Sequence, residues 1–178
     1  MNFKVERFEI SGKTVTVYPS GDADDPVIYL NMFADIGDEI YNMLLARQFP
    51  DFTLVTISNL NWDHDMCPWE IPPISQNDTP CTGGADEYLK LLENEIIPRA
   101  ENGLKSVSWR GIAGYSLAGL FAVYLLYKTD IFARAASMSG SLWFPDFKEF
   151  VFENKLKRRP DYLYFSLGDR EHKTRNPF

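Results

Sequence analysis

The amino-acid sequence predicts one α/β domain, residues 1–178, built on a mostly parallel sheet. Short continuous apolar runs, typical of strands buried on both faces, alternate with segments of helical periodicity. An antiparallel hairpin precedes them, and a strand–turn–helix pattern with Ser116 at its turn lies near the middle of the chain. A chain of 178 residues is long enough for one substantial core and too short for two ordinary domains.

The first predicted elements are a hairpin and a strand–helix–strand unit. Residues 3–18 predict two strands joined by a turn at Ser11-Gly12-Lys13. The apolar run 27–33 predicts a buried strand, and Asp35 is expected to cap a helix over about residues 36–49. Residues 52–58 predict the next buried strand.

The second half of the chain continues the alternation after a long irregular segment. Loops as long as residues 59–81 are usually functional or disordered, and the tryptophans in this one argue against disorder. A helix is expected after Gly84, and Pro98 is expected to kink or end it. The remaining predicted elements are a strand at 107–113, a helix over 117–128, a strand at 132–138, a helix over 146–158 and a strand at 162–167.

The stretch RGIAGYSLAGL, residues 110–120, has the layout of a nucleophile elbow, in which a sharp turn between a strand and a helix displays a serine. Such a turn leaves room only for small residues two positions before and after the serine. Gly114 and Ala118 occupy those positions around Ser116, so the last glycine of G-x-S-x-G is replaced by alanine. The alternative is a buried strand–turn–helix with an incidental serine.

Composition excludes several classes of function. The net charge of −7, from 18 Lys+Arg and 25 Asp+Glu, repels polyphosphates, so no nucleic-acid partner is expected. The sequence contains neither the G-x-G-x-x-G nor the G-x-x-x-x-G-K-[ST] motif of nucleotide-binding domains. It shows no signal peptide and no apolar run of membrane-spanning length, and Cys67 and Cys81 are expected to be free thiols. A soluble, cytoplasmic protein without a membrane partner is therefore predicted.

Five segments, spread over most of the chain, give it a resemblance to a known family. They are GYSLAGLFA (114–122), NLNWDHDMCPW (59–69), TGGADEYLKLLENEIIP (82–98), SMSGSLW (137–143) and SLGDREHKTRN (166–176). The chain resembles the α/β-hydrolase superfamily, and within it the esterase branch that includes enterobactin-type siderophore esterases and esterase D-like enzymes. The resemblance implies a three-layer sandwich and a serine hydrolase of carboxylic esters that uses no cofactor and no metal.

The resemblance also implies roles for individual residues. Ser116 would be the nucleophile that forms an acyl-enzyme. The backbone N–H groups of Leu117 and of Phe33, or a neighbour of Phe33, would form the oxyanion hole. Glu171 would be the acid of the catalytic triad, with Asp169 as the reserve.

The catalytic histidine is where the sequence departs from this pattern. The family places it after one more helix and strand, and the sequence ends before them, at Phe178. Only His64 and His172 are present. A polar loop role is favoured for His64, and His172 adjoins the acid without occupying the family position. A C-terminally short member is therefore expected: a fragment, a product that has lost activity, or a chain that receives its histidine from another chain. A non-catalytic binding module is the alternative function.

Two further expectations concern ligand and partner. Trp62, Trp69 and Trp143 lie in loops on the side of the sheet expected to carry the serine, where they would line a pocket for a small-molecule ester or pack the loops down. The strand at 162–167 would be an uncharged edge rich in aromatic residues, which favours a homodimer through that edge.

Overall fold

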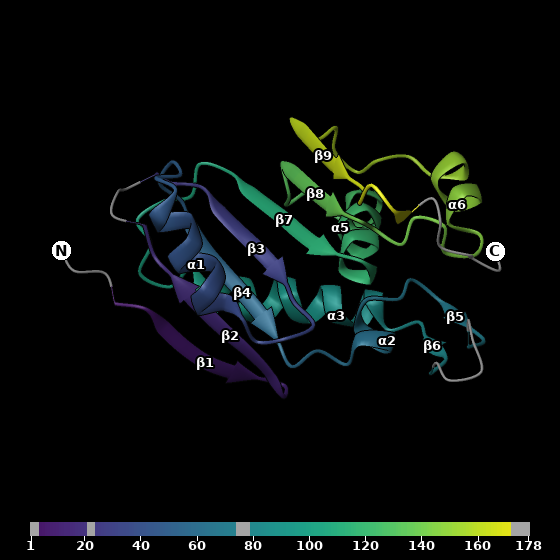
Figure 1. Ribbon diagram of the computed structural model, residues 1–178, viewed down its shortest axis with the longest axis horizontal. Coiled ribbons are helices and arrows are strands. Elements are labelled where there is room, and N and C mark those ends of the chain that lie inside the picture. Colours follow the sequence, from purple (N-terminus) through teal and green to yellow (C-terminus); the bar gives the residue numbers. More distant parts are fainter. Residues whose placement is uncertain (1–3, 21–23, 74–78, 172–178) are drawn as a thin grey trace.

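The computed structural model describes residues 4–20, 24–73 and 79–171 (Figure 1). Its main sheet has seven strands in the order β1-β2-β4-β3-β7-β8-β9. The two strands at the β1 edge run antiparallel to their neighbours, and the pairs from β4 to β9 are all parallel. The strands are β1 (Glu6–Ile10), β2 (Lys13–Tyr18), β3 (Val27–Asn31), β4 (Thr53–Ser58), β7 (Arg110–Tyr115), β8 (Arg134–Met138) and β9 (Tyr162–Ser166).

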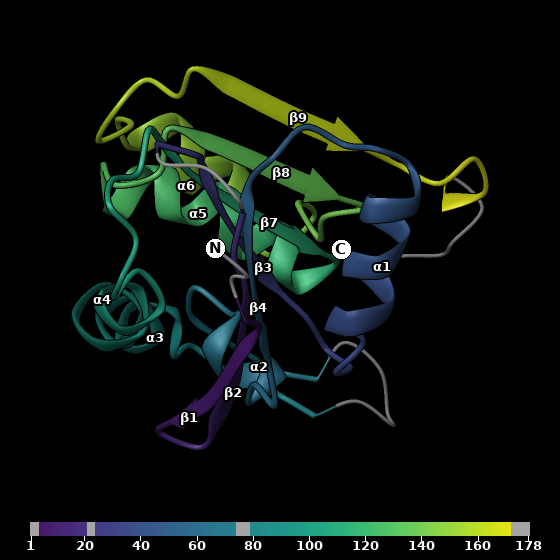
Figure 2. The same cartoon turned by 90° about the vertical axis from the view of Figure 1, so that its left-hand side faces the viewer.

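Helices cover both faces of this sheet, which confirms the predicted three-layer α/β-hydrolase sandwich. Figure 2, which views the sheet from its edge, shows α1 on one face and the other main helices on the opposite face. The helices are α1 (Gly37–Ala46), α2 (Trp62–Asp65), α3 (Ala85–Leu91), α4 (Ile97–Ala100), α5 (Leu117–Lys128) and α6 (Phe147–Glu153). The α5 helix is apolar nearly all round and supplies Leu120, Phe121 and Leu125 to the core without any exposed surface.

The N-terminal hairpin has the tightest connection that an antiparallel pair allows. Ile10 pairs directly with Lys13, so the turn consists of Ser11 and Gly12 alone, with φ angles of 50° and 77°. Two successive positive φ angles match the twist of the flanking strands. The predicted turn included Lys13, which instead begins β2, and Phe3 of the predicted hairpin lies outside the described residues.

Three helix predictions needed adjustment. Asp35 does not cap α1, because its carboxylate forms an ion pair with Arg7, and α1 begins at Gly37 without a side-chain cap. The helix predicted to reach residue 158 ends at Glu153. Pro98, which was expected to kink or end its helix, does not end it: α3 passes through a π-helical turn, η1 (Leu92–Ile96), and continues as α4. The missing N–H of Pro98 and the bulk of its ring are accommodated where the helix has widened.

The β9 strand is an edge of the sheet, as predicted. Its Tyr162, Leu163, Tyr164 and Phe165 side chains are 68%, 46%, 58% and 51% exposed. An uncovered strand edge with this composition is a template for pairing with another chain.

We therefore expect the protein to associate through β9 as its concentration rises, as measured by light scattering. Leu163→Lys should prevent this association, because a lysine on an edge strand opposes pairing. Met43→Lys, at a residue that is 57% exposed on α1, is the matched control and should leave the association unchanged. A monomer at every concentration would contradict the prediction.

Candidate active site

The turn between β7 and α5 holds Ser116 in a conformation that few residues other than glycine adopt. Its φ and ψ are 57° and −124°, and backbone strain of this kind costs about 1–3 kcal/mol. A Cβ on Gly114 would lie 2.4 Å from the carbonyl carbon and oxygen of Ala118. The strained turn and the small residues around it therefore match the predicted elbow.

The strand register brings several predicted site residues together at the carboxyl ends of the parallel strands. Asn31 on β3 pairs with Gly114, and Tyr115 pairs with Met138 on β8. Because these strands are parallel, the residues that follow them emerge side by side. Phe33 and Ser116 therefore leave the sheet at the same edge, and Figure 1 shows the strand arrows pointing to the side where α2 lies.

The small-residue loop after β8 packs against the Ser116 turn. The Ser116 N–H donates to the carbonyl oxygen of Met138 at 3.1 Å, and the Ser141 N–H donates to the carbonyl oxygen of Ser116 at the same distance. The two hydroxyl oxygens of Ser116 and Ser141 are 3.4 Å apart. Ser141 is 4% exposed and was not among the predicted site residues.

The two residues predicted to form the oxyanion hole, Leu117 and Phe33, follow the neighbouring strands β7 and β3. Leu117 is the first residue of α5, and the first N–H groups of a helix have no partner inside the helix. Phe33 follows β3, the strand that pairs with β7, and it is 76% exposed. Its ring meets the indole of Trp62 edge to face, with the ring centroids 5.3 Å apart.

Glu171 lies in the turn after β9. Its Oε1 accepts the N–H of Gly168 at 2.7 Å. A hydrogen bond from the Ser139 side chain, followed by the bond from Gly168, holds the pKa of Glu171 below its usual value. The carboxylate is therefore ionised at neutral pH, as a triad acid must be. Among the described residues no hydrogen bond joins the Glu171 carboxylate to Ser116. Asp169, the reserve candidate for the acid, lies in the same turn with an exposed side chain.

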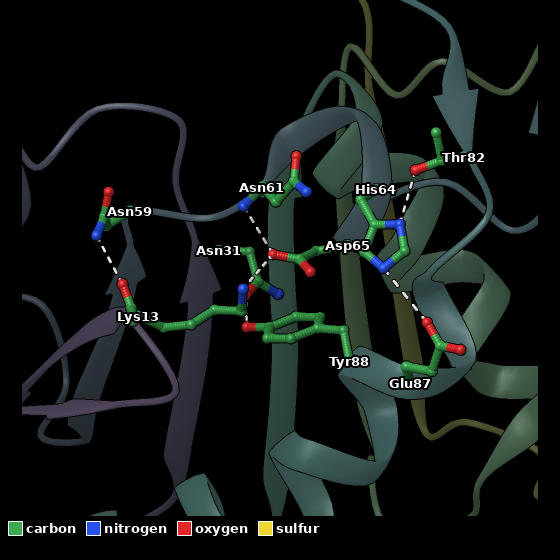
Figure 3. A network of polar contacts seen from close by, with 10 residues as sticks. Lys13, Asn31, Asn59, Asn61, His64, Asp65, Thr82, Glu87 and Tyr88 are labelled. Atoms are coloured by element: carbon green, nitrogen blue, oxygen red, sulfur yellow. Dashed lines mark hydrogen bonds and ion pairs between the residues drawn. The ribbon is translucent and has the colours of Figure 1, made fainter.

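His64 contacts side chains other than that of Ser116. Its Nδ1 lies 2.6 Å from the hydroxyl of Thr82 and its Nε2 lies 3.3 Å from the carboxylate of Glu87 (Figure 3). A Cβ on Gly84 would lie 2.2 Å from Nε2, so the imidazole ring rests on that glycine. His64 thus has the polar structural contacts that were favoured for it, although it lies in the short helix α2. His172 lies outside the described residues.

A cavity of about 240 Å³ opens beside the serine. It is lined by Trp62, Asp63, Thr79, Cys81, Ser116, Leu117, Ser141 and Trp143. Two of the three tryptophans predicted to bind substrate therefore share a cavity with Ser116.

The third predicted tryptophan, Trp69, lies elsewhere. Its ring packs within an aromatic cluster, 5.7 Å from the centroids of both Phe144 and Phe150, and its Nε1–H donates to the carbonyl of Pro145 at 3.0 Å. These contacts pack the long loop against α6. Of the two roles predicted for the tryptophans, Trp69 therefore has the packing role.

The two cysteines are paired, so the expectation of free thiols was wrong. A two-stranded antiparallel ribbon forms between β5 (Glu70–Ile71) and β6 (Cys81–Thr82). This pairing brings Cys67 and Cys81 together as a disulfide, with their Cα atoms 6.0 Å apart. They are 14 positions apart in the sequence, and only the fold shows that they meet. The disulfide holds the wall of the cavity to which Cys81 belongs.

A buried ion pair anchors α2, the helix that supplies Trp62 and Asp63 to the cavity. Lys13 Nζ lies 2.6 Å from Asp65 Oδ2, and the same carboxylate oxygen accepts the N–H of Asn61 at 2.8 Å (Figure 3). Beside them the hydroxyl of Tyr88 donates to Asn31 at 2.6 Å. Burial, and then the charge of Asp65, raises the pKa of Tyr88 above its usual value, so its hydroxyl stays protonated as a donor.

Residues 4–20, 24–73 and 79–171 contain no group of three or more His, Cys, Asp or Glu side chains that could hold a metal ion. In the same part of the chain, every helix is too short or too polar to span a bilayer.

The chain is similar to known proteins in both sequence and fold. It is similar to the uncharacterized protein YbbA of Bacillus subtilis, with 24% identity, 96% of this chain aligned and 74% of YbbA. The fold is similar to the siderophore hydrolase EstA of Aspergillus nidulans (TM-score 0.73, 20% identity, 98% of this chain and 72% of EstA).

It is also similar to an IroE-like serine hydrolase of Shewanella oneidensis (TM-score 0.69, 23% identity, 84% of this chain). The chain spans 55% of the length of that protein. A family model described as "Putative esterase" matches residues 27–174, which include the elbow, the cavity and the turn of Glu171. The chain belongs to this esterase family of the α/β-hydrolase superfamily.

Proposed function

We propose that the chain is the nucleophile-bearing domain of a serine hydrolase of carboxylic esters, with Ser116 as the nucleophile. The observation that carries this proposal is the strained Ser116 turn at the N-terminus of α5, beside a cavity large enough for part of a small ester. Family membership supports ester hydrolysis as the reaction class. The similarity to a siderophore hydrolase adds ester siderophores to the candidate substrates.

In this mechanism the Ser116 Oγ attacks the ester carbonyl carbon while its proton passes to a general base. The carbonyl oxygen, now an anion, accepts the N–H groups of Leu117 and Phe33. The C–O bond to the alcohol then breaks and the alcohol leaves with the proton from the base. A water molecule attacks the acyl-enzyme by the same route, which releases the acid and restores Ser116.

The general base is the part that the described residues do not supply to Ser116. His64 has both ring nitrogens next to other side chains, and Glu171 is ionised but does not contact the serine. Losing one member of a triad removes most of its catalytic power. For the 178-residue chain by itself we therefore expect little or no ester turnover. Glu171 would orient and stabilise a protonated histidine supplied to this edge of the sheet.

This proposal predicts that a fluorophosphonate modifies Ser116 slowly, and that added imidazole accelerates the reaction because it replaces the missing base. Intact-mass measurement should show one adduct. Ser116→Ala should abolish the adduct, whereas Ser141→Ala, which removes the neighbouring hydroxyl, should retain it. An adduct that persists in Ser116→Ala would contradict the proposal.

The contacts of His64 with Thr82 and Glu87 favour the alternative, a non-catalytic binding module on a hydrolase scaffold. That alternative predicts that Ser116 stays unmodified at every imidazole concentration while the cavity still binds ligands. Mass measurement and a binding titration on one sample therefore separate the two functions.

A further inference from the structure

The charge of the cavity beside Ser116 limits the ligands that it can bind. Of its eight lining residues only Asp63 carries a charge at neutral pH, and none is lysine or arginine. Lys13, which contacts α2, is already paired with Asp65. An ester that brings a carboxylate, phosphate or other anion into this space would meet a carboxylate with no compensating cation.

The rest of the lining is suited to the opposite charge. Trp62 and Trp143 lie in the same cavity as Asp63, and the face of an indole attracts cations more strongly than any other aromatic side chain. An alkylammonium group can therefore bury its methyl or methylene groups against the indoles while its charge is balanced by the carboxylate. The net charge of −7 acts in the same direction, because it draws cations toward the protein and repels anions.

The carboxylate is held in place by its neighbours. The Thr79 hydroxyl donates to Asp63 Oδ2, and an ionised carboxylate has acceptor capacity beyond that one bond. Asp63 lies on α2, whose position is fixed by the buried pair of Lys13 and Asp65. The ring of Phe33 packs against Trp62 and orients the indole next to it. A site held in this way loses little freedom when a ligand binds.

We propose that this cavity recognises a cationic group, so that the substrates of the site are esters whose acyl or alcohol part carries an ammonium group. The inference rests on the proposed esterase function for its reaction, and on Asp63, Trp62 and Trp143 for its specificity. Asp63 binds the cation and Ser116 attacks the ester bond that adjoins it. The two residues line one cavity, so a compact ester can reach both.

The test compares a cation with its neutral isostere on the intact chain. Choline and 3,3-dimethylbutan-1-ol have nearly the same shape and differ in one charge. Isothermal titration calorimetry should give a dissociation constant for choline about tenfold lower than that for the alcohol, the size expected for a partly desolvated cation near indoles and a carboxylate. Asp63→Asn should remove this preference, because it keeps the shape of the side chain and removes its charge.

Asp130→Asn is the matched control, since Asp130 is an exposed carboxylate that is not part of the cavity lining. It should leave the preference for choline unchanged. Equal affinities of choline and the neutral alcohol in the unaltered protein would overturn the inference, as would a preference that survives in Asp63→Asn.

The outcome is independent of whether Ser116 reacts. Modification of Ser116 by fluorophosphonate without a choline preference would keep the proposed function and reject the cation site. A choline preference that depends on Asp63 without any modification of Ser116 would keep the cation site and reject the esterase.

Discussion

Replacing Asp65 by asparagine is expected to lower the free energy of unfolding by about 3 kcal/mol, because it leaves the ammonium group of Lys13 buried without a counter-charge. The side chains of Lys13 and Asp65 are 12% and 6% exposed, so water cannot fully replace the lost partner. Asparagine keeps the size of the side chain and can still accept the N–H of Asn61. The decrease in the free energy of unfolding therefore measures the effect of removing the charge. Urea unfolding followed by circular dichroism measures it.

The exposed pair of Arg7 and Asp35 supplies the control. Their side chains are 53% and 41% exposed, and pairs in this setting contribute at most about 1 kcal/mol. Asp35→Asn, the same chemical change, should therefore have a much smaller effect than Asp65→Asn. Combining Lys13→Met with Asp65→Asn should cost less than the sum of the single changes, since neither charge is then left alone. Additive losses would contradict the role of the buried pair.

The same ion pair links the stability of the protein to its site. Asp65 ends α2, and the first two residues of that helix, Trp62 and Asp63, form one side of the cavity. The Asp65→Asn variant should therefore also weaken choline binding under conditions where it remains folded. Asp35→Asn should not, because Asp35 lies outside the cavity.

The sequence predicted most of the fold because its strands are marked by burial on both faces. Residues 27–33 and 52–58 stand out as apolar runs, and the strands found there pair in parallel. The elbow was also readable, since a strained turn demands small residues at Gly114 and Ala118. The ends of helices were predicted less accurately. Aspartate is a common N-cap residue, but the carboxylate of Asp35 pairs with the distant Arg7 and does not cap α1.

The site was predictable where it depends on local pattern and not where it depends on the folding of the long loop. Ser116 and Phe33 share a sheet edge because parallel strands end together, which the order of elements already implies. Asp63 was missed as a cavity residue, as were the disulfide of Cys67 with Cys81 and the buried pair of Asp65. Each of these depends on tertiary contacts of residues 59–73 and 79–82, for which hydrophobic periodicity gives no signal.

Gly114→Ala is expected to disable the site and to destabilise the fold through one added methyl group. The new Cβ would lie 2.4 Å from the carbonyl carbon and oxygen of Ala118, which are backbone atoms in the first turn of α5. Backbone cannot move aside as a side-chain tip does, so β7 and α5 must separate and the Ser116 turn must open. Overpacking of this kind costs about 1–3 kcal/mol. Imidazole-assisted modification of Ser116 should fall at least tenfold, since the strained conformation that presents its hydroxyl is lost.

Gly111→Ala separates this effect from the general consequences of replacing a glycine in the same strand. Its Cβ would lie 3.2 Å from a ring carbon of Trp109, and its other contacts are at ordinary distances. A tryptophan ring can shift by a few tenths of an ångström, and the reduced freedom of the unfolded chain offsets part of the cost. The free energy of unfolding of Gly111→Ala should therefore differ by no more than about 1 kcal/mol from that of the original protein. Ser116 should still be modified in this variant. Equal losses in the two variants would mean that the contact of Gly114 with Ala118 does not hold the Ser116 turn in its strained form.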